Sequence, residues 1–274
     1  MNRQCTNPGH PRCEGNGFTL IELSIIIIVI GLILGAVMVG RDLLEAAKIR
    51  STVSQIEAIN TAAMTFKNKY GGLPGDLVRA TQFGFAGDSS PVRAGLGDGN
   101  GAIQNQAGVD TDSQNQLNYY YEQGWFWIQL NQSGLTNTNV DVTGAWTASG
   151  CPVTAIWDGA GKTSYFPMLP LSNSFLFVYS INRVNYVEIA DNCGMLTCSI
   201  CRANSLSPAR AYSLDTKLDD GQPLTGIVRA TGGGGGLDGL GYPAAVGGNC
   251  VGAGGAYNMT YGPAACSLQI KPPF

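Results

Sequence analysis

Residues 17–40 read GFTLIELSIIIIVIGLILGAVMVG, an apolar stretch whose only charged residue is Glu22. From Phe18 to Val39 it holds 22 residues. That is about 33 Å of helix at 1.5 Å per residue, which matches the hydrocarbon core of a bilayer. A carboxylate inside a membrane segment is energetically costly and usually marks a function. The stretch therefore predicts one membrane-spanning helix that carries a functional glutamate.

The polar leader ahead of this stretch, residues 1–17, does not have the layout of a secretory signal peptide. Such a signal places a small-residue cleavage site after its apolar region, whereas Arg41 and Asp42 follow directly here. We therefore expect the apolar segment to stay in the mature protein. Arg3 and Arg12 favour a cytoplasmic N-terminus with the bulk of the chain outside, although Arg41 on the other flank reduces this charge difference.

The helix is expected to continue past the apolar stretch. Apolar residues recur there at steps of three and four, the pattern of one apolar helix face. They are Ile49, Val53, Ile56, Ile59, Ala63, Phe66 and Tyr70. Gly71-Gly72 and then Pro74 end the pattern, and no proline occurs between residues 18 and 73. The sequence thus predicts one helix over residues 18–70, about 80 Å long.

The segment from Gly17 to Glu22, GFTLIE, followed by an apolar run, resembles the N-terminal signature of type IV pilins and of type II secretion pseudopilins. The resemblance firmly covers residues 17–75. It implies that a prepilin peptidase cleaves after Gly17 and methylates the new N-terminal Phe18. It also implies that Glu22, the fifth mature residue, is needed for subunit addition, with Thr19 beside it in the recognised stretch.

The same resemblance implies how the chain is divided. Residues 1–17 form a leader that is removed, residues 18–70 a transmembrane and polymerisation helix, and residues 71–274 an extracytoplasmic head. The expected fold class is α+β and pilin-like. In that fold the long N-terminal helix packs on a disulfide-stabilised head with an antiparallel sheet.

Two features of the apolar segment each leave two interpretations open. In a filament, the amine of the next subunit's first residue can neutralise Glu22 and set the axial register. Alternatively, Glu22 lies near the membrane interface and reaches the headgroups. Gly31 and Gly35 form a G-x-x-x-G pair that allows close helix packing, or they reflect the ordinary frequency of glycine in membrane helices.

The head is predicted to contain short strands and two helices. A helix is expected over 113–133, and a shorter one begins at Ser207-Pro208 with an N-cap and Pro at its first position. Strands are expected at 152–157, 164–168, 174–181, 184–190 and 225–231. The third and fourth are joined by Asn182-Arg183 and indicate a hairpin. Loops are expected over 84–116 and in the glycine-rich stretch 232–255.

The cysteines fit an oxidising compartment. Cys5 and Cys13 lie in the leader, and six remain: Cys151, Cys193, Cys198, Cys201, Cys250 and Cys266. An even number in an extracytoplasmic head predicts up to three disulfides, with buried free thiols as the alternative. The C-x-x-C at 198–201 is half of a zinc site, and oxidation competes with zinc outside the cytoplasm. The resemblance to pilins implies that Cys250 pairs with Cys266 and closes a C-terminal loop.

The segment 98–103 raises the hypothesis of a calcium site. Asp98-Gly-Asn100-Gly-Ala-Ile103 is similar to part of an EF-hand calcium loop. Leu96 stands where its first aspartate belongs, and Ala107 where its glutamate belongs. Asp110 or Asp112 could complete a different oxygen cage. A polar turn without calcium is the favoured interpretation, so no cofactor is expected.

Catalysis and nucleic-acid binding are disfavoured. The only histidine, His10, lies in the leader, so the mature chain has none for a triad, a zinc cluster or a histidine base. Residues 159–163, GAGKT, resemble the end of a P-loop, but Ile156 stands where the first glycine is required. The net charge is −3 without a basic block, which disfavours binding to nucleic-acid backbones.

The sequence therefore predicts a non-enzymatic structural subunit of an extracytoplasmic helical filament. Its expected partners are further copies of itself, other pilins or pseudopilins, prepilin peptidase, and the inner membrane before assembly. One alternative is a minor pilin or pseudopilin of a type II secretion system that primes or tips the filament. Another class of protein fits too: a membrane-anchored adhesin or binding protein that does not polymerise.

Overall fold

A computed structural model describes residues 18–85, 97–104, 122–136, 167–171, 174–192, 202–231 and 247–274, and two short strands before them. These strands, β1 (Cys5–Thr6) and β2 (Arg12–Cys13), pair antiparallel. The chain divides into two compact units, residues 1–47 and residues 48–274. The larger, five-stranded sheet and all described helices other than the first part of the long helix belong to the second unit.

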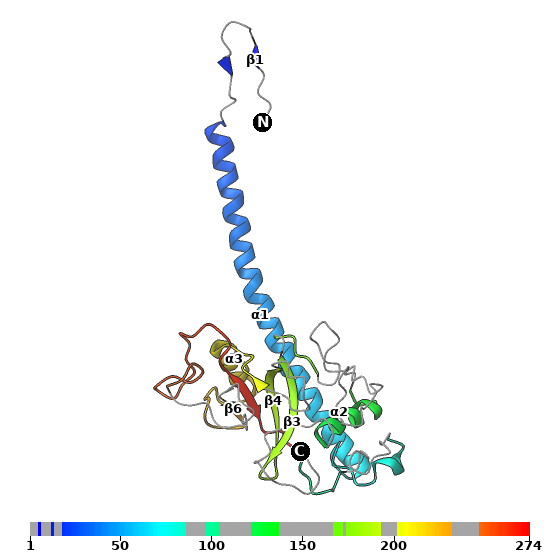
Figure 1. The fold of residues 1–274 in the computed structure, drawn as a ribbon. Coiled ribbons are helices and arrows are strands. Elements are labelled where there is room, and N and C mark those ends of the chain that lie inside the picture. Colours follow the sequence, from blue (N-terminus) through cyan, green and yellow to red (C-terminus); the bar gives the residue numbers. More distant parts are fainter. Residues whose placement is uncertain are drawn as a thin grey trace. The chain divides into compact units, whose positions relative to one another are not determined.

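The long helix α1 spans Leu20–Tyr70, as the sequence predicts (Figure 1). It is the one helix among the described residues that is long and apolar enough to cross a membrane. It ends at Gly71, whose backbone N–H donates to Lys67 O at 2.9 Å and whose φ is +81°. A left-handed residue of this kind after the last turn is the common glycine stop signal of helices.

The two parts of α1 differ in the exposure of their side chains. All residues from 18 to 39 are exposed. From residue 49 onward one face is buried, and it consists of Ile49, Thr52, Ile56, Ile59, Ala62, Ala63 and Phe66. Five of the seven residues predicted for the apolar face are therefore buried, while Val53 and Tyr70 are partly buried against the core. This part of the helix is held by packing in the second unit.

The head contains an antiparallel sheet with the strand order β3-β4-β7-β6. Its strands are β3 (Ser174–Ile181), β4 (Val184–Asn192), β7 (Ser267–Ile270) and β6 (Val228–Thr231), and the short β5 (Arg202–Ala203) pairs with the end of β4. The predicted hairpin is confirmed. Its two turn residues, Asn182 and Arg183, have φ values of +49° and +62°, the left-handed geometry of tight hairpin turns.

Two further α-helices and a short 3-10 helix complete the described head. They are α2 (Glu122–Gln132), α3 (Pro208–Leu218) and η1 (Ala80–Phe83). Residues 113–121 of the first predicted head helix lie outside the described residues, as do the predicted strand 152–157 and most of 164–168. The last predicted strand begins three residues late, at Val228, and the sequence did not predict β7.

The second unit has one hydrophobic core made of large side chains from α1, α2 and the sheet. Its largest fully buried members are Trp127, Phe66, Phe126, Phe177 and Ile56. Near the end of α1 the aromatic rings of Phe66, Tyr70 and Phe85 lie with their centroids 4.5–5.3 Å apart. These three rings form an aromatic cluster beside the end of α1.

Candidate functional site

The first turn of α1 forms a capping box between Thr19 and Glu22. The backbone N–H of Thr19 and its hydroxyl both donate to Glu22 Oε2 at 2.8 Å, and the Glu22 N–H lies 3.3 Å from Thr19 Oγ1. This reciprocal arrangement satisfies N–H groups that a helix start leaves without intrahelical partners. Both contacts to the carboxylate use Oε2. Phe18, before them, is 72% exposed, and Gly17 lies outside the described residues.

The apolar part of α1 presents its side chains outward. Leu20 is 88% exposed and Leu32 is 70% exposed. A Cβ added at Gly31 or Gly35 would meet no heavy atom within 4 Å. An exposed apolar surface of this extent is typical of a segment that contacts lipid or another protein. The glycine pair stays a predicted packing site, since a single chain does not test it.

The exit from α1 is fixed against α2 by a hydrogen bond to a side chain and by a close approach of the two backbones. The N–H of Gly75 donates to the buried Gln129 Oε1 at 2.7 Å. A Cβ on Gly75 would lie 2.1 Å from Glu122 O, and φ at this glycine is +83°. Both the close approach and the backbone conformation therefore require glycine at this position.

Beside this exit lies a carboxylate cluster, defined here as Asp76, Asp98 and Glu122. Asp76 accepts from the N–H groups of Gly99 and Gly101, each at 2.7 Å. Glu122 accepts from the N–H of Asp98 at 3.1 Å and from that of Gln104 at 2.7 Å. The loop 97–104 is thus held by carboxylates from the α1 exit and from the start of α2.

Burial disfavours the ionised forms of the carboxyl groups in this cluster. Asp76 and Glu122 are buried, and burial is the main cause that raises the pKa of Asp76 to about 6 and of Glu122 to about 8. The backbone N–H donors act in the opposite direction, whereas the neighbouring carboxylates raise both pKa values further. The cluster therefore retains protons at pH values where isolated carboxyl groups have lost them.

The predicted calcium ligands, Asp98 and Asn100, lie in this loop. One oxygen from each carboxylate of the cluster lies within 4.8 Å of the others, which is close enough for a shared cation. Asn100 Oδ1, however, accepts the N–H of Ala102 at 2.8 Å, and Asp98 Oδ1 accepts that of Asn100 at 3.0 Å. These bonds describe a polar turn. Asp110 and Asp112, the other predicted cage residues, lie outside the described residues.

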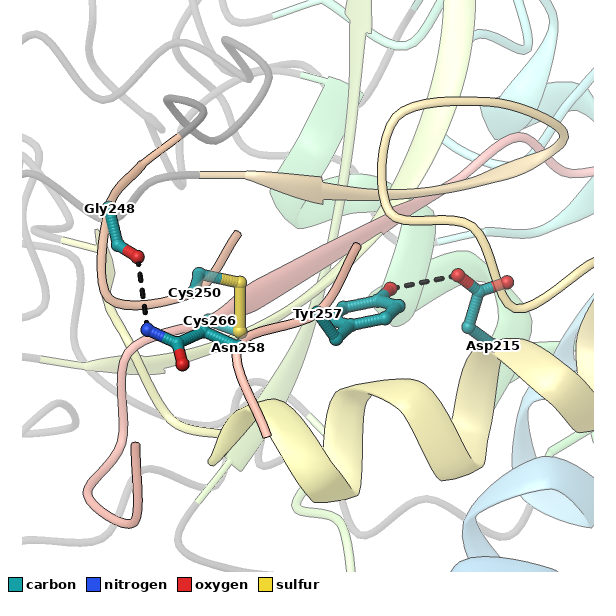
Figure 2. Close-up of a disulfide and its surroundings, with 6 residues drawn as sticks. All are labelled: Asp215, Gly248, Cys250, Tyr257, Asn258 and Cys266. Atoms are coloured by element: carbon teal, nitrogen blue, oxygen red, sulfur yellow. Dashed lines mark hydrogen bonds between the residues drawn. A yellow bond between two sulfur atoms is a disulfide. The ribbon is translucent and has the colours of Figure 1, made fainter. Parts of the chain in front are cut away.

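A second acidic group, Asp215, Asp219 and Asp220, lies at the end of α3. Its member Asp215 contacts the C-terminal loop (Figure 2). Cys250 and Cys266 are joined by a disulfide, the pairing that the resemblance implied. Within the loop they close, Tyr257 donates its hydroxyl to the buried Asp215 Oδ2 at 2.8 Å. Burial raises the pKa of Asp215 to about 6. The other four cysteines predicted to form disulfides lie outside the described residues: Cys151, Cys193, Cys198 and Cys201.

Sequence reasoning missed Asp76 and Glu122. The available signal is weak: Asp76 follows the helix stop, and Glu122 lies within the helix predicted over 113–133. It also missed the capping box, although the T-x-x-E pattern at Thr19 and Glu22 is readable from sequence.

Comparison of the chain with protein-family models, with curated protein sequences and with solved structures found no match. What the structure defines is a class of architecture. It is an α+β chain with one long apolar N-terminal helix, a small antiparallel sheet and a disulfide in its C-terminal loop.

Proposed function

We propose that this protein is a structural subunit of an extracytoplasmic helical filament, assembled through its N-terminal helix. The observation that carries the proposal is the first part of α1, with an exposed apolar surface from residue 18 to 39 and one carboxylate, Glu22, in its first turn. A long helix with this surface needs lipid or other helices around it. The GFTLIE signature favours a pilin-type filament over a permanent anchor.

Processing would create the second partner for Glu22. Cleavage after Gly17 turns the Phe18 amide nitrogen into a free amine, which methylation leaves positively charged. Opposite charges attract strongly in a medium of low dielectric constant. The positively charged amine of one subunit is therefore a suitable partner for the Glu22 carboxylate of the next. The capping bonds occupy Oε2, so Oε1 offers a second acceptor without loss of the helix cap.

Before assembly the apolar segment spans the inner membrane, with the N-terminus in the cytoplasm and the head outside. On assembly, neighbouring helices replace lipid around the segment, and van der Waals packing at small residues such as Gly31 and Gly35 supports the bundle. The heads then form the outer surface of the filament. Prepilin peptidase, other pilins or pseudopilins, and further copies of the chain are the proposed partners, and no enzymatic activity is proposed.

Glu22→Ala tests this proposal. It should abolish incorporation into filaments, measured by electron microscopy of sheared surface material, while membrane fractions still contain the chain. Glu57→Ala is the matched control, because Glu57 is an exposed glutamate on the same helix and its loss should leave filaments intact. Normal filaments with alanine at residue 22 would contradict the proposal.

The alternative of a membrane-anchored binding protein has one observation in its favour. A groove of about 490 Å³ at the end of α1 has Lys67, Arg79, Tyr70 and Phe83 in its lining, together with Asp76, glycines and aliphatic side chains. A binding protein would keep its ligand after Glu22→Ala, and its function would not depend on filaments. In the minor-pilin alternative the chain primes or tips the filament of a type II secretion system, so counting copies per filament separates it from a major subunit.

A further inference from the structure

Two Asn-x-Ser/Thr tripeptides in the sequence have no role in the proposed filament function. They are Asn131-Gln132-Ser133 and Asn258-Met259-Thr260. In a protein exposed outside the cytoplasm, this tripeptide is the acceptor for N-linked sugars when it lies in a surface loop. The structure gives the two tripeptides different surroundings.

The first tripeptide lies at the end of a helix. Asn131 belongs to the last turn of α2, so its backbone is helical. The Ser133 hydroxyl donates to Leu130 O at 2.7 Å, which directs it to the helix backbone. Neither the loop conformation nor a hydroxyl directed at the asparagine is present here.

The second tripeptide lies in a turn of the loop that the Cys250–Cys266 disulfide closes. The N–H of Tyr261 donates to Asn258 O at 3.0 Å, which forms a turn over residues 258–261. Thr260 Oγ1 donates to Asn258 Oδ1 at 2.6 Å. Met259 is 57% exposed and Thr260 is also exposed. Asn258 itself is half-buried, so its carboxamide meets the Thr260 hydroxyl at the edge of an exposed turn.

The carboxamide nitrogen of Asn258 can be modified without loss of its contact to the protein. Its Nδ2 donates to Gly248 O at 3.4 Å (Figure 2), which is longer than usual for such a bond and marks it as weak. A carboxamide has two N–H groups, and glycosylation replaces one of them. The other can keep the bond to Gly248, and the backbone bond from Asn258 N to Cys250 O at 2.9 Å is not affected.

We propose that Asn258 is an N-glycosylation site and that Asn131 is not. The donor is an oligosaccharide linked to a lipid through pyrophosphate. Asn258 Nδ2 forms a bond to the anomeric carbon while the bond from that carbon to the pyrophosphate oxygen breaks. Nδ2 releases one proton, and the lipid pyrophosphate leaves with the electron pair. This inference rests on the extracytoplasmic head of the proposed function.

The full chain, purified from the cells that naturally make it, provides the test. Trypsin separates the tripeptides, because residues 94–162 form one peptide and residues 230–274 another, the bond before Pro272 being resistant. Tandem mass spectrometry should find sugar on Asn258 and none on Asn131. The sugar should disappear in Asn258→Gln and Thr260→Ala and persist in Thr260→Ser, which keeps the hydroxyl.

Protease accessibility of the head in intact cells separates the two possible failures. An extracytoplasmic head with an unmodified 230–274 peptide, or with sugar on Asn131, overturns the glycosylation site and leaves the filament proposal standing. A head found in the cytoplasm overturns both. Loss of sugar in Thr260→Ala together with an unchanged melting temperature excludes misfolding as the cause.

Discussion

The hydroxyl of Tyr257 donates a hydrogen bond to the buried carboxylate of Asp215, at 2.8 Å. This bond joins α3 to the loop that the Cys250–Cys266 disulfide closes. The same loop is therefore held by a disulfide and by a buried hydrogen bond. A buried carboxylate that loses a donor keeps its desolvation cost, so the contact is expected to be important for stability.

Tyr257→Phe should lower the free energy of unfolding by about 1.5–3 kcal/mol, the range for a hydrogen bond to a charged group. The measurement is denaturant unfolding at pH 8, above the pKa of about 6 that burial gives Asp215. Tyr212→Phe is the control, since Tyr212 is 42% exposed, and it should change little. Equal stability of the two variants would show that the bond contributes nothing.

Gly75→Ala should be far more destabilising than Gly84→Ala. Both glycines have φ near +80°, so each substitution carries the strain of a left-handed residue, about 1–2 kcal/mol. Only at Gly75 would the new Cβ meet backbone, 2.1 Å from Glu122 O, whereas at Gly84 it meets nothing within 4 Å. Thermal unfolding of the detergent-solubilised chain measures both. Similar melting temperatures would mean that the exit from α1 is less tightly packed than the contacts indicate.

The stability of the head should fall as pH rises. The ordinary pKa of Glu122 is 4.5 and burial raises it to about 8, so between these values the folded state binds a proton that the unfolded state releases. The stabilisation is complete below pH 4.5 and is lost as pH rises past about 8. Asp76 contributes in the same direction, from 3.8 to about 6.

Unfolding free energies at pH 5 and pH 8 test this dependence, with the higher value expected at pH 5. Glu122→Gln should flatten the profile above pH 7, because Asp76 and Asp215, whose pKa values are raised to about 6, have largely lost their protons there. A head that is more stable at pH 8 than at pH 5 would contradict the buried, proton-retaining cluster.

Calcium should leave the loop 97–104 unchanged. The backbone N–H groups of Gly99 and Gly101 already bind both oxygens of Asp76, which favours a polar turn over a cation cage. The melting temperature should be the same with a chelator and with added calcium. A calcium-dependent rise that disappears in Asp98→Asn would instead establish the EF-hand-like hypothesis.

Local signals made much of the fold predictable from sequence. The step of three and four from Ile49 to Phe66 predicts which face of α1 is buried, since periodicity reports burial directly. Asn182-Arg183 between two apolar runs predicts the hairpin, because a two-residue turn fixes its register. The strand β7 was not predictable, since it has only four residues and both of its partners lie far from it in the sequence.

The carboxylate cluster was beyond sequence reasoning for a related reason. Asp76 and Glu122 come together only because Gly75 lets the α1 exit approach α2 within van der Waals contact. Nothing in the local sequence of either residue indicates a partner in the other segment. The Thr19–Glu22 pair, by contrast, is a contact over three residues, and its pattern can be read directly.

Mass spectrometry of the mature N-terminus tests the central claim most directly. The proposed pilin-type assembly predicts that the chain isolated from membranes or filaments begins with N-methyl-phenylalanine at Phe18, with residues 1–17 absent. An intact Met1, or cleavage beyond residue 40 that removes the apolar segment, would contradict the account.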